Sequence, residues 1–438
     1  MSSVRVDPIQ PGAAGYRQHM VYRKVFPRPD LTDLLRAGGS RVMATTAEEG
    51  SEITLFCDFG EPVILDPDDA VTGLARLLEG AAPATPLSFS GWVGFFGYEF
   101  LASHMGLRLT APRDIELPGG LFARPQTIAR LHGDRLQVES LIPGRVEAFA
   151  LPGNRDSMGV PEPQTPRHPE IRCNLDVTAY ERIFAKAREE ILRGNTYQIK
   201  ISLRYETDSA PDPVSSFVRL WKSNPAPESF LLRWDAFALV SCSPESVITR
   251  RGDLIRTRPI GGTWPRASTD TQETLQRFAH DPKETAEHNM IVDLERNDLS
   301  RVCRSGSVRI EALRALETYE HLHHLVTSIA GELRTGVGSA EILAAMLPGG
   351  SITGCPKYRT MELIDQMEPV FRGPYTGSFG RLHDNGDLDL NLIIRTMVCA
   401  GGRAYVQAGG GIVIDSTPAY EYRENRMKAE ALLQLLQG

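Results

Sequence analysis

Two stretches of the sequence carry carboxylates at helical spacing, and such stretches can present oxygen ligands to a divalent cation. The first predicted helix begins at residue 282 and carries on one face Glu284, Glu287 and His288. The second begins at residue 418 and carries along one stripe Glu421, Glu424 and Lys428. Mg²⁺ often takes only one or two protein carboxylates, so two such helices facing each other could build a magnesium site. Two solvated helix faces rich in glutamate are the alternative that spacing alone leaves open.

An anion could be held by a glycine-rich segment and by one arginine. A predicted strand leads into three consecutive glycines, Gly409, Gly410 and Gly411, whose backbone N–H groups no side chain obstructs. A plain turn is the other meaning of such a segment. Arg395 lies in the apolar run 390–398, where a guanidinium needs a partner. That partner is either a bound carboxylate or an internal acid.

Capping residues and periodicity predict the elements that would position these side chains. Thr178 and Glu181 form a capping box for a helix, and Gly194 stands where the C-terminal glycine of that helix belongs. The next segment, 198–206, alternates as a strand does. Its apolar face is formed by Ile199, Ile201, Leu203 and Tyr205, and its polar face by Gln198, Lys200, Ser202 and Arg204. The polar face is either the wall of a pocket or a solvated surface.

A proline-rich segment divides the chain. Residues 151–170 hold several prolines among polar residues, a composition that interrupts helices and central strands. At 438 residues the chain exceeds what one hydrophobic core usually supports. We therefore expect an N-terminal portion at 1–150, a linker at 151–170 and a main portion at 171–438.

The bulk composition argues against several classes of protein. A net charge of −7 disfavours a surface for nucleic acid or anionic membrane, which would need a basic excess. No apolar run approaches the roughly 20 residues that span a bilayer, and the N-terminus lacks the pattern of a signal peptide. Six scattered cysteines without a Cys-x-x-Cys pair indicate reduced thiols. We expect a cytoplasmic globular protein that has neither nucleic acid nor membrane as a partner.

A series of short motifs follows in order along the main portion, at residues 194–198, 243–245, 259–263, 286–288, 293–298, 348–357, 372–377, 394–396, 408–413 and 421–428. Together they resemble the chorismate-utilising enzymes, a family that includes anthranilate synthase component I, aminodeoxychorismate synthase component I, and the isochorismate and salicylate synthases. The resemblance runs from about Asn174 to the C-terminus and is weaker before the linker, chiefly at residues 92–98. Many matches in order are far more specific than any single motif.

The resemblance implies a fold of the α/β class, of α+β type, with stacked antiparallel β-sheets surrounded by helices and the active site between the layers. It implies Mg²⁺ held by Glu287 and Glu424, with Glu284 and Glu421 supporting through water. The metal would bind the ring carboxylate of chorismate, with Lys428 adding charge there. The enolpyruvyl carboxylate would be held by Tyr375, Arg395 and the amides of the turn formed by Gly409, Gly410 and Gly411.

Ammonia is favoured over water as the nucleophile. The resemblance places three catalytic positions at Gln198, Thr263 and His288. Family members that add water resemble one another in a lysine base at the position of Gln198 and a glutamate acid at the position of Arg258. A neutral amide and a permanently charged guanidinium cannot replace that pair near neutral pH. Ammonia needs no such base, because it arrives as a neutral nucleophile.

A partner protein is expected to supply the ammonia. The sequence has no Gly-x-Cys-x-Gly nucleophile turn of a glutaminase, and similar chains receive ammonia from a separate glutamine amidotransferase subunit. We therefore expect chorismate and ammonia as substrates, such a subunit as partner, and activity of the isolated chain with free ammonia.

The product is 4-amino-4-deoxychorismate or anthranilate. Aminodeoxychorismate synthases often carry a nucleophilic lysine where this chain has Gly261, and Gly261 resembles anthranilate synthases. His288 resembles them too, and there it assists proton handling and loss of pyruvate. The segment 348–354 and the lack of a Leu-Leu-Glu-Ser motif instead resemble aminodeoxychorismate synthases. We expect 4-amino-4-deoxychorismate, with anthranilate plus pyruvate as the alternative and a non-catalytic chorismate-binding regulator as a third possibility.

Lys200 departs from the family pattern, which usually has Val or Asn at this position. One hypothesis is that its amine replaces the missing lysine, because it shares a strand face with Gln198. A solvated or ion-paired lysine is the alternative.

Overall fold

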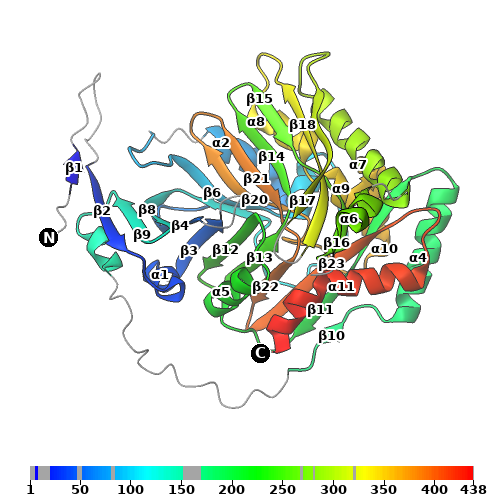
Figure 1. Ribbon diagram of the computed structural model, residues 1–438, viewed down its shortest axis with the longest axis horizontal. Helices are drawn as coiled ribbons and strands as arrows, with labels where there is room; N and C mark the ends of the chain where they lie inside the picture. The colour runs from blue at the N-terminus through cyan, green and yellow to red at the C-terminus, as the bar shows by residue number, and fades with distance from the viewer. Residues whose placement is uncertain are drawn as a thin grey trace.

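Two antiparallel sheets lie at the centre of the protein, with helices on their outer sides (Figure 1). The computed structural model describes residues 5–7, 20–46, 52–79, 84–150, 169–266, 270–279, 282–318 and 322–437. Most of the predicted linker, at 151–168, lies outside the described residues, as does Asp281.

Within these residues the larger sheet has thirteen strands. Their order across the sheet is β1 (Arg5–Asp7), β2 (Val21–Pro27), β9 (Arg135–Ser140), β8 (Pro125–His132), β4 (Glu52–Phe59), β3 (Arg41–Thr46), β12 (Glu228–Trp234), β13 (Phe237–Ser243), β22 (Thr396–Ala400), β23 (Arg403–Ile412), β11 (Gln198–Thr207) and β10 (Arg172–Cys173). The short strand β19 (Gly354–Cys355) pairs with the start of β11.

The smaller sheet has ten strands over the same described ranges. Their order is β16 (Ile260–Pro265), β18 (Leu322–Glu332), β15 (Leu254–Thr257), β14 (Ser246–Arg251), β21 (Leu388–Leu392), β20 (Ser378–His383), β6 (Gly91–Phe96), β7 (Gly120–Ala123) and β5 (Val63–Leu65). Strand β17 (Arg309–Thr318) pairs with β18. Both sheets contain strands from the N-terminal portion and from the main portion, so the two portions share both sheets.

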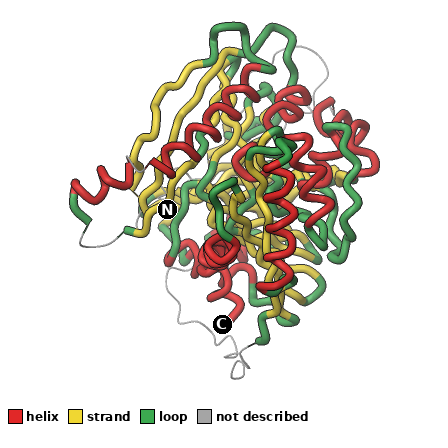
Figure 2. Tube along the Cα trace, turned by 90° about the vertical axis from the view of Figure 1, so that its right-hand side faces the viewer, coloured by secondary structure: helices red, strands yellow, loops and turns green. Residues whose placement is uncertain are grey.

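Figure 2 shows the helices on both sides of the strands. Their bounds are α1 (Leu31–Ala37), α2 (Ala70–Glu79), α3 (Tyr98–His104), α4 (Val177–Leu192), α5 (Pro213–Ser223), α6 (Gln272–Ala279), α7 (Pro282–Ser300), α8 (Ser339–Met346), α9 (Gly350–Thr353), α10 (Lys357–Met367) and α11 (Pro418–Gln437), with short 3₁₀ helices η1 (Pro67–Asp69) and η2 (Arg145–Phe149). In the described residues, no helix is long and apolar enough to cross a membrane.

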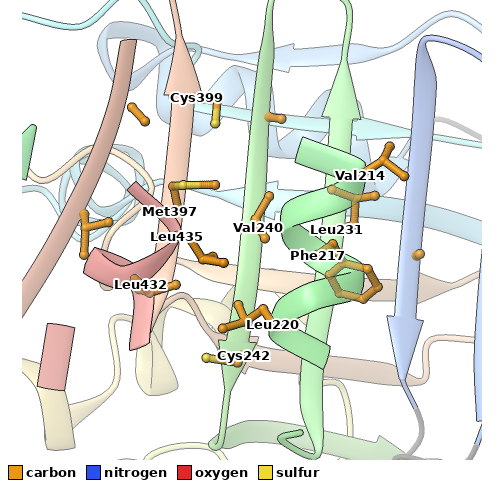
Figure 3. Close-up of a cluster of buried hydrophobic side chains, with 14 of the residues drawn as sticks. Val214, Phe217, Leu220, Leu231, Val240, Cys242, Met397, Cys399, Leu432 and Leu435 are labelled. Atoms are coloured by element: carbon orange, nitrogen blue, oxygen red, sulfur yellow. The ribbon is translucent and has the colours of Figure 1, made fainter. Parts of the chain in front are cut away.

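Alternation along the strands divides the core into layers. On β12, Leu231 faces outward, while Phe230 and Leu232 face the smaller sheet. Figure 3 shows the outer layer, where Phe217 of α5 and Leu432 of α11 pack on the larger sheet. Helices α2, α3, α7 and α8 cover the outer face of the smaller sheet in the same way. The predicted fold, stacked antiparallel sheets with helices outside, is confirmed.

Most of the predicted local structure is confirmed, with one corrected cap. Helix α4 ends before Gly194, whose φ of 76° is the left-handed conformation that favours glycine at this place. The predicted capping box is wrong: the cap is Asp176, two residues before Thr178, because its side chain accepts a hydrogen bond from the backbone N–H of Ala179. All six cysteines lie in the described ranges and are unpaired, as expected.

One stacked pair of aromatic rings joins the two sheets. Phe230 of β12 and Phe379 of β20 are both fully buried, with ring centroids 4.0 Å apart and ring planes 7° from parallel. The ring of each fills space on the inner face of the opposite sheet, so the pair helps to set how the sheets pack.

Phe379→Ala should therefore lower the free energy of unfolding by about 3–5 kcal/mol, through lost burial and the cavity left behind. Denaturation in urea followed by far-UV circular dichroism measures this loss. Val71→Ala, at an exposed position of α2, is the control and should change stability by no more than about 0.5 kcal/mol. Equal midpoints for the two variants would contradict the role of the pair.

Candidate active site

The polar face of β11 is largely buried and is not the solvated surface that the sequence left open: Gln198, Ser202 and Arg204 are buried, and Lys200 is half-buried. Gln198 donates a hydrogen bond from Nε2 to Oε1 of Glu287, at 3.0 Å. The Nζ atom of Lys200 lies 3.7 Å from the same oxygen. Farther along this face, Ser202 contacts Glu368 and Arg204 is paired with Asp114. Lys200 therefore forms an ion pair, which agrees with the alternative to a catalytic base that the sequence left open.

Helix α11 brings two carboxylates to the same region, and their electrostatic surroundings differ. Glu424 is paired through Oε1 with Nζ of Lys428, at 2.8 Å. Burial alone would raise the pKa of Glu424, but the charges of Lys428 and Lys200 outweigh it and lower that pKa. Glu421 is only 2% exposed. Burial, with the charge of Glu424, raises the pKa of Glu421 to about 7.

The carboxylates offer the donors that a hard divalent cation needs. Oε1 of Glu421 accepts a hydrogen bond from Ser416, whereas its Oε2 is buried and has no hydrogen-bond partner. Such an oxygen is costly unless a proton or a cation meets it. No group of three or more His, Cys, Asp or Glu residues that could hold a metal ion is found in the described part of the chain; the side chain of Glu284 lies outside it. Glu287, Glu421 and Glu424 nevertheless fit Mg²⁺, which often takes one or two carboxylates.

The three glycines at 409–411 lie in a strand and not in the turn that the sequence indicated. They belong to β23, with Gly409 opposite Ser202 and Gly411 opposite Lys200 on β11. The pairing of β23 with β22 ends at Val406, so no described strand pairs with the other edge of the glycine segment. Backbone N–H groups on that edge, beyond the end of β22, could donate to an anion, and the binding of a carboxylate there stays a prediction.

Arg395 lies between β21 and β22, with a backbone φ of 50° that is unusual outside glycine. Among the described residues its guanidinium makes no hydrogen bond or ion pair, so no internal acid of this part of the chain neutralises it. Burial lowers the pKa of Arg395. An incoming anion would therefore gain an unshared guanidinium partner.

Tyr375 reaches the glycine segment from the other side. A Cβ atom on Gly409 would lie 2.7 Å from the hydroxyl oxygen of Tyr375. Burial raises the pKa of Tyr375, so the hydroxyl keeps its proton and can donate. The structure thus gathers Tyr375 and the segment 409–411, which the sequence predicted to share one anion.

A carboxylate of the N-terminal portion holds the loop that carries Tyr375. Glu99 of α3 accepts backbone N–H groups from Arg372 and Gly373, at 2.8 and 2.9 Å. The Arg372 guanidinium in turn pairs with Glu368 and donates to the backbone oxygen of Lys200, at 2.8 Å. Glu99 was not predicted, because nothing in its own sequence neighbourhood shows that it meets a loop some 270 residues away.

His288 is fully buried beneath β16. Its Nε2 lies 2.5 Å from the hydroxyl oxygen of Thr327, and a Cβ on Gly261 would lie 1.6 Å from its Nδ1. Burial, with the charge of Arg314, lowers the pKa of His288 to about 4, so the ring is neutral near pH 7. Its catalytic role stays a prediction, as does that of Thr263, whose side chain lies outside the described residues.

Two buried groups near the site were given no role from the sequence. Glu245 accepts a hydrogen bond from Ser351 at 2.7 Å, and burial raises the pKa of Glu245 to about 7, against the charge of Lys200. His324 of β18 is buried, and burial with the charge of Arg395 lowers the pKa of His324 to about 4. The motif at 243–245 pointed to Glu245, but only the fold shows what it faces.

Known proteins are similar to this chain in sequence. The family described as chorismate binding enzyme matches residues 44–434. Aminodeoxychorismate synthase component 1 of Bacillus subtilis is 41% identical over 260 residues, which are 59% of this chain and only 55% of that relative. Anthranilate synthase component 1 of Thermus thermophilus is 36% identical over 365 residues, covering 81% of this chain and 79% of that relative.

Solved structures agree on the fold. Anthranilate synthase component I of Streptococcus pneumoniae superposes with a TM-score of 0.72 at 24% identity, covering 97% of this chain and 94% of that one. The menaquinone-specific isochorismate synthase MenF of Escherichia coli gives 0.73 at 18% identity, covering 98% and 96%. At these identities the likeness concerns the fold alone.

The burial of Glu99 predicts that the free energy of unfolding depends on pH. Burial raises the pKa of Glu99 from 4.5 to about 7. Between these values the folded protein keeps a proton that the unfolded chain has lost, so this group lowers the free energy of unfolding as pH rises through the interval, by up to about 1.4 kcal/mol per unit.

Glu99→Gln cannot titrate, so it should lack this loss and gain stability relative to wild type from about pH 5 to about pH 8. Urea denaturation across that range measures the difference. Glu79→Gln, at an exposed position of α2, should run parallel to wild type. A difference between Glu99→Gln and wild type that does not vary with pH would contradict the prediction.

Proposed function

Because the chain belongs to the family of chorismate binding enzymes, we propose that it aminates chorismate with ammonia to give 4-amino-4-deoxychorismate. At the coarser level, the chain is a chorismate-utilising enzyme of the aminodeoxychorismate synthase and anthranilate synthase type. The observation that carries the choice of ammonia is the hydrogen bond between Gln198 and Glu287, which puts a neutral amide where the water-adding relatives have a lysine base.

The two carboxylates of chorismate find separate partners in this proposal. Arg395, which has no hydrogen bond or ion pair among the described residues, binds the enolpyruvyl carboxylate together with the hydroxyl of Tyr375 and the open edge of 409–411. Lys428, whose Nζ lies between Glu424 and the backbone oxygen of Gly409, adds positive charge near the ring carboxylate. Charge-assisted hydrogen bonds of this kind are stronger than neutral ones.

Glu287 and Glu424 would hold Mg²⁺, with Glu421 and Glu284 supporting. The bound metal would supply a positive centre that binds the ring carboxylate and stabilises charge developing on the ring. The chain itself orients the ligands: Gln198 holds one oxygen of Glu287, and Ser416 holds one oxygen of Glu421 while leaving the other without a donor.

The residue at the position of the catalytic acid does not favour water as a nucleophile. Arg258, at the position of the acid in water-adding relatives, is tied to Glu317 at 2.6 Å and stays charged. Ammonia carries its own lone pair at neutral charge and needs only to be placed near the ring. A glutamine amidotransferase subunit is the proposed source in the cytoplasm, with free ammonia as a substitute in vitro.

Anthranilate synthesis is the second candidate, and one observation favours it. The ring of His288 occupies the space beside Gly261, so position 261 cannot hold a lysine of the kind that aminodeoxychorismate synthases often carry there, unless His288 moves. Amination at the other ring carbon, followed by loss of pyruvate, would then give anthranilate.

A product assay separates the two candidates. Incubation with chorismate, Mg²⁺ and ammonium should consume chorismate without fluorescence, and an added lyase should then release 4-aminobenzoate. Anthranilate fluoresces without the lyase, so fluorescence at the first stage would establish the second candidate.

Glu287→Gln is expected to abolish turnover, because it removes a ligand charge, and full activity in that variant would refute the assignment of the metal ligands.

Arg395→Gln should raise the KM for chorismate by roughly 100-fold, because truncating one partner of a buried charge pair costs about 3 kcal/mol. Steady-state kinetics with ammonium in excess measures this change. Arg41→Gln, which removes an exposed guanidinium paired with Asp235, is the matched control. A KM within about twofold of wild type for Arg395→Gln would exclude this guanidinium from substrate binding.

A further inference from the structure

Lys200 is fixed in place by its backbone and by the residue opposite it. Its carbonyl accepts a hydrogen bond from Arg372, and β11 pairs it with Gly411 of β23. A Cβ on Gly411 would lie 2.7 Å from Nζ of Lys200 and 3.2 Å from its Cε. The lysine side chain therefore lies across Gly411, in space that any larger residue there would fill.

One carboxylate lies within ion-pair distance of the ammonium of Lys200. Glu287 of α7 lies 3.7 Å from it. The charge of Lys200 also reaches two other carboxyl groups: it adds to the larger effect of Lys428 that lowers the pKa of Glu424, and it opposes, without overcoming, the burial that raises the pKa of Glu245. The side chain of Lys200 is only 14% exposed, so water screens these interactions weakly.

Lys428, the other lysine of the site, differs in its surroundings. It pairs with Glu424 one turn away on the same helix, and its side chain is 29% exposed. Lys200 instead pairs strand β11 with Glu287 of α7, a residue 87 positions away in the sequence. The ammonium of Lys200 and the side-chain amide of Gln198 both contact Oε1 of Glu287. Glu287 would have to lose these contacts before that oxygen could bind a metal ion.

We propose that Lys200 is a tethered counter-cation of the metal site: its ammonium pairs with Glu287 when no metal is bound, and Mg²⁺ must compete with it for that carboxylate. The proposal rests on the proposed function, which assigns Glu287 and Glu424 to the metal. In this role Lys200 stays protonated. The hypothesis that its amine replaces the lysine base missing at position 198 would instead require the loss of that proton.

Binding of Mg²⁺ to the full chain, measured by calorimetry without chorismate, tests this proposal. Lys200→Met keeps the length of the side chain and removes its charge, so Mg²⁺ should bind roughly tenfold or more tightly than to wild type. Lys186→Met, at an exposed position of α4, is the matched control and should bind Mg²⁺ as wild type does. In the presence of a chelator, Lys200→Met should also melt at a lower temperature than wild type, and Mg²⁺ should reverse that loss.

The outcomes separate the two proposals. Mg²⁺ binding that is lost in Glu287→Gln and unchanged or weaker in Lys200→Met would overturn the role of Lys200 and leave the metal assignment standing. No Mg²⁺ binding to wild type or to Lys200→Met would overturn the metal assignment, and the role of Lys200 with it. If Lys200→Met does not fold, Lys200→Gln removes the same charge and gives the same comparison.

Discussion

Charge balance on the buried face of β11 is the constraint on which the site depends. A carboxylate out of contact with water is stable only when a cation, a proton or several hydrogen bonds compensate it. Glu287 is compensated by Gln198 and Lys200, Glu424 by Lys428, and Glu421 only in part by Ser416. Oε2 of Glu421 has no hydrogen-bond partner among the described residues, so it could bind a divalent cation. In the proposed site, that cation would also have to displace the ammonium of Lys200 from Glu287.

The same constraint explains why the site needs both sheets and both helix layers. Helix α11 lies against β23 and β11 of the larger sheet (Figure 1). Helix α7 lies against β16 and β18 of the smaller sheet. Glu287 of α7 can meet Lys200 of β11 only if the two sheets keep their relative position, and the apolar layer between the sheets, with Phe230 stacked on Phe379, holds that position.

The N-terminal portion contributes to the site through Glu99. Its carboxylate anchors the backbone of Arg372 and Gly373, and Arg372 connects that loop to the backbone of Lys200. One chain of hydrogen bonds thus runs from α3 through the loop before Tyr375 to the backbone of β11. A carboxylate on α3 can in this way help to set the positions of both Tyr375 and Lys200.

The sequence by itself determined the elements and the chemical types of the site. Capping residues, alternation and proline predicted α7, α11 and β11 closely, because these signals act over a few residues, and ordered motifs indicated the family. Local signals could not place Glu99, Glu245 or His324, or show that the segment 409–411 is strand and not turn. They also left open whether Lys200 is solvated. Those features were decided by the tertiary structure alone, because burial, pairing of remote strands and the sharing of one oxygen by two side chains exist only after distant segments meet.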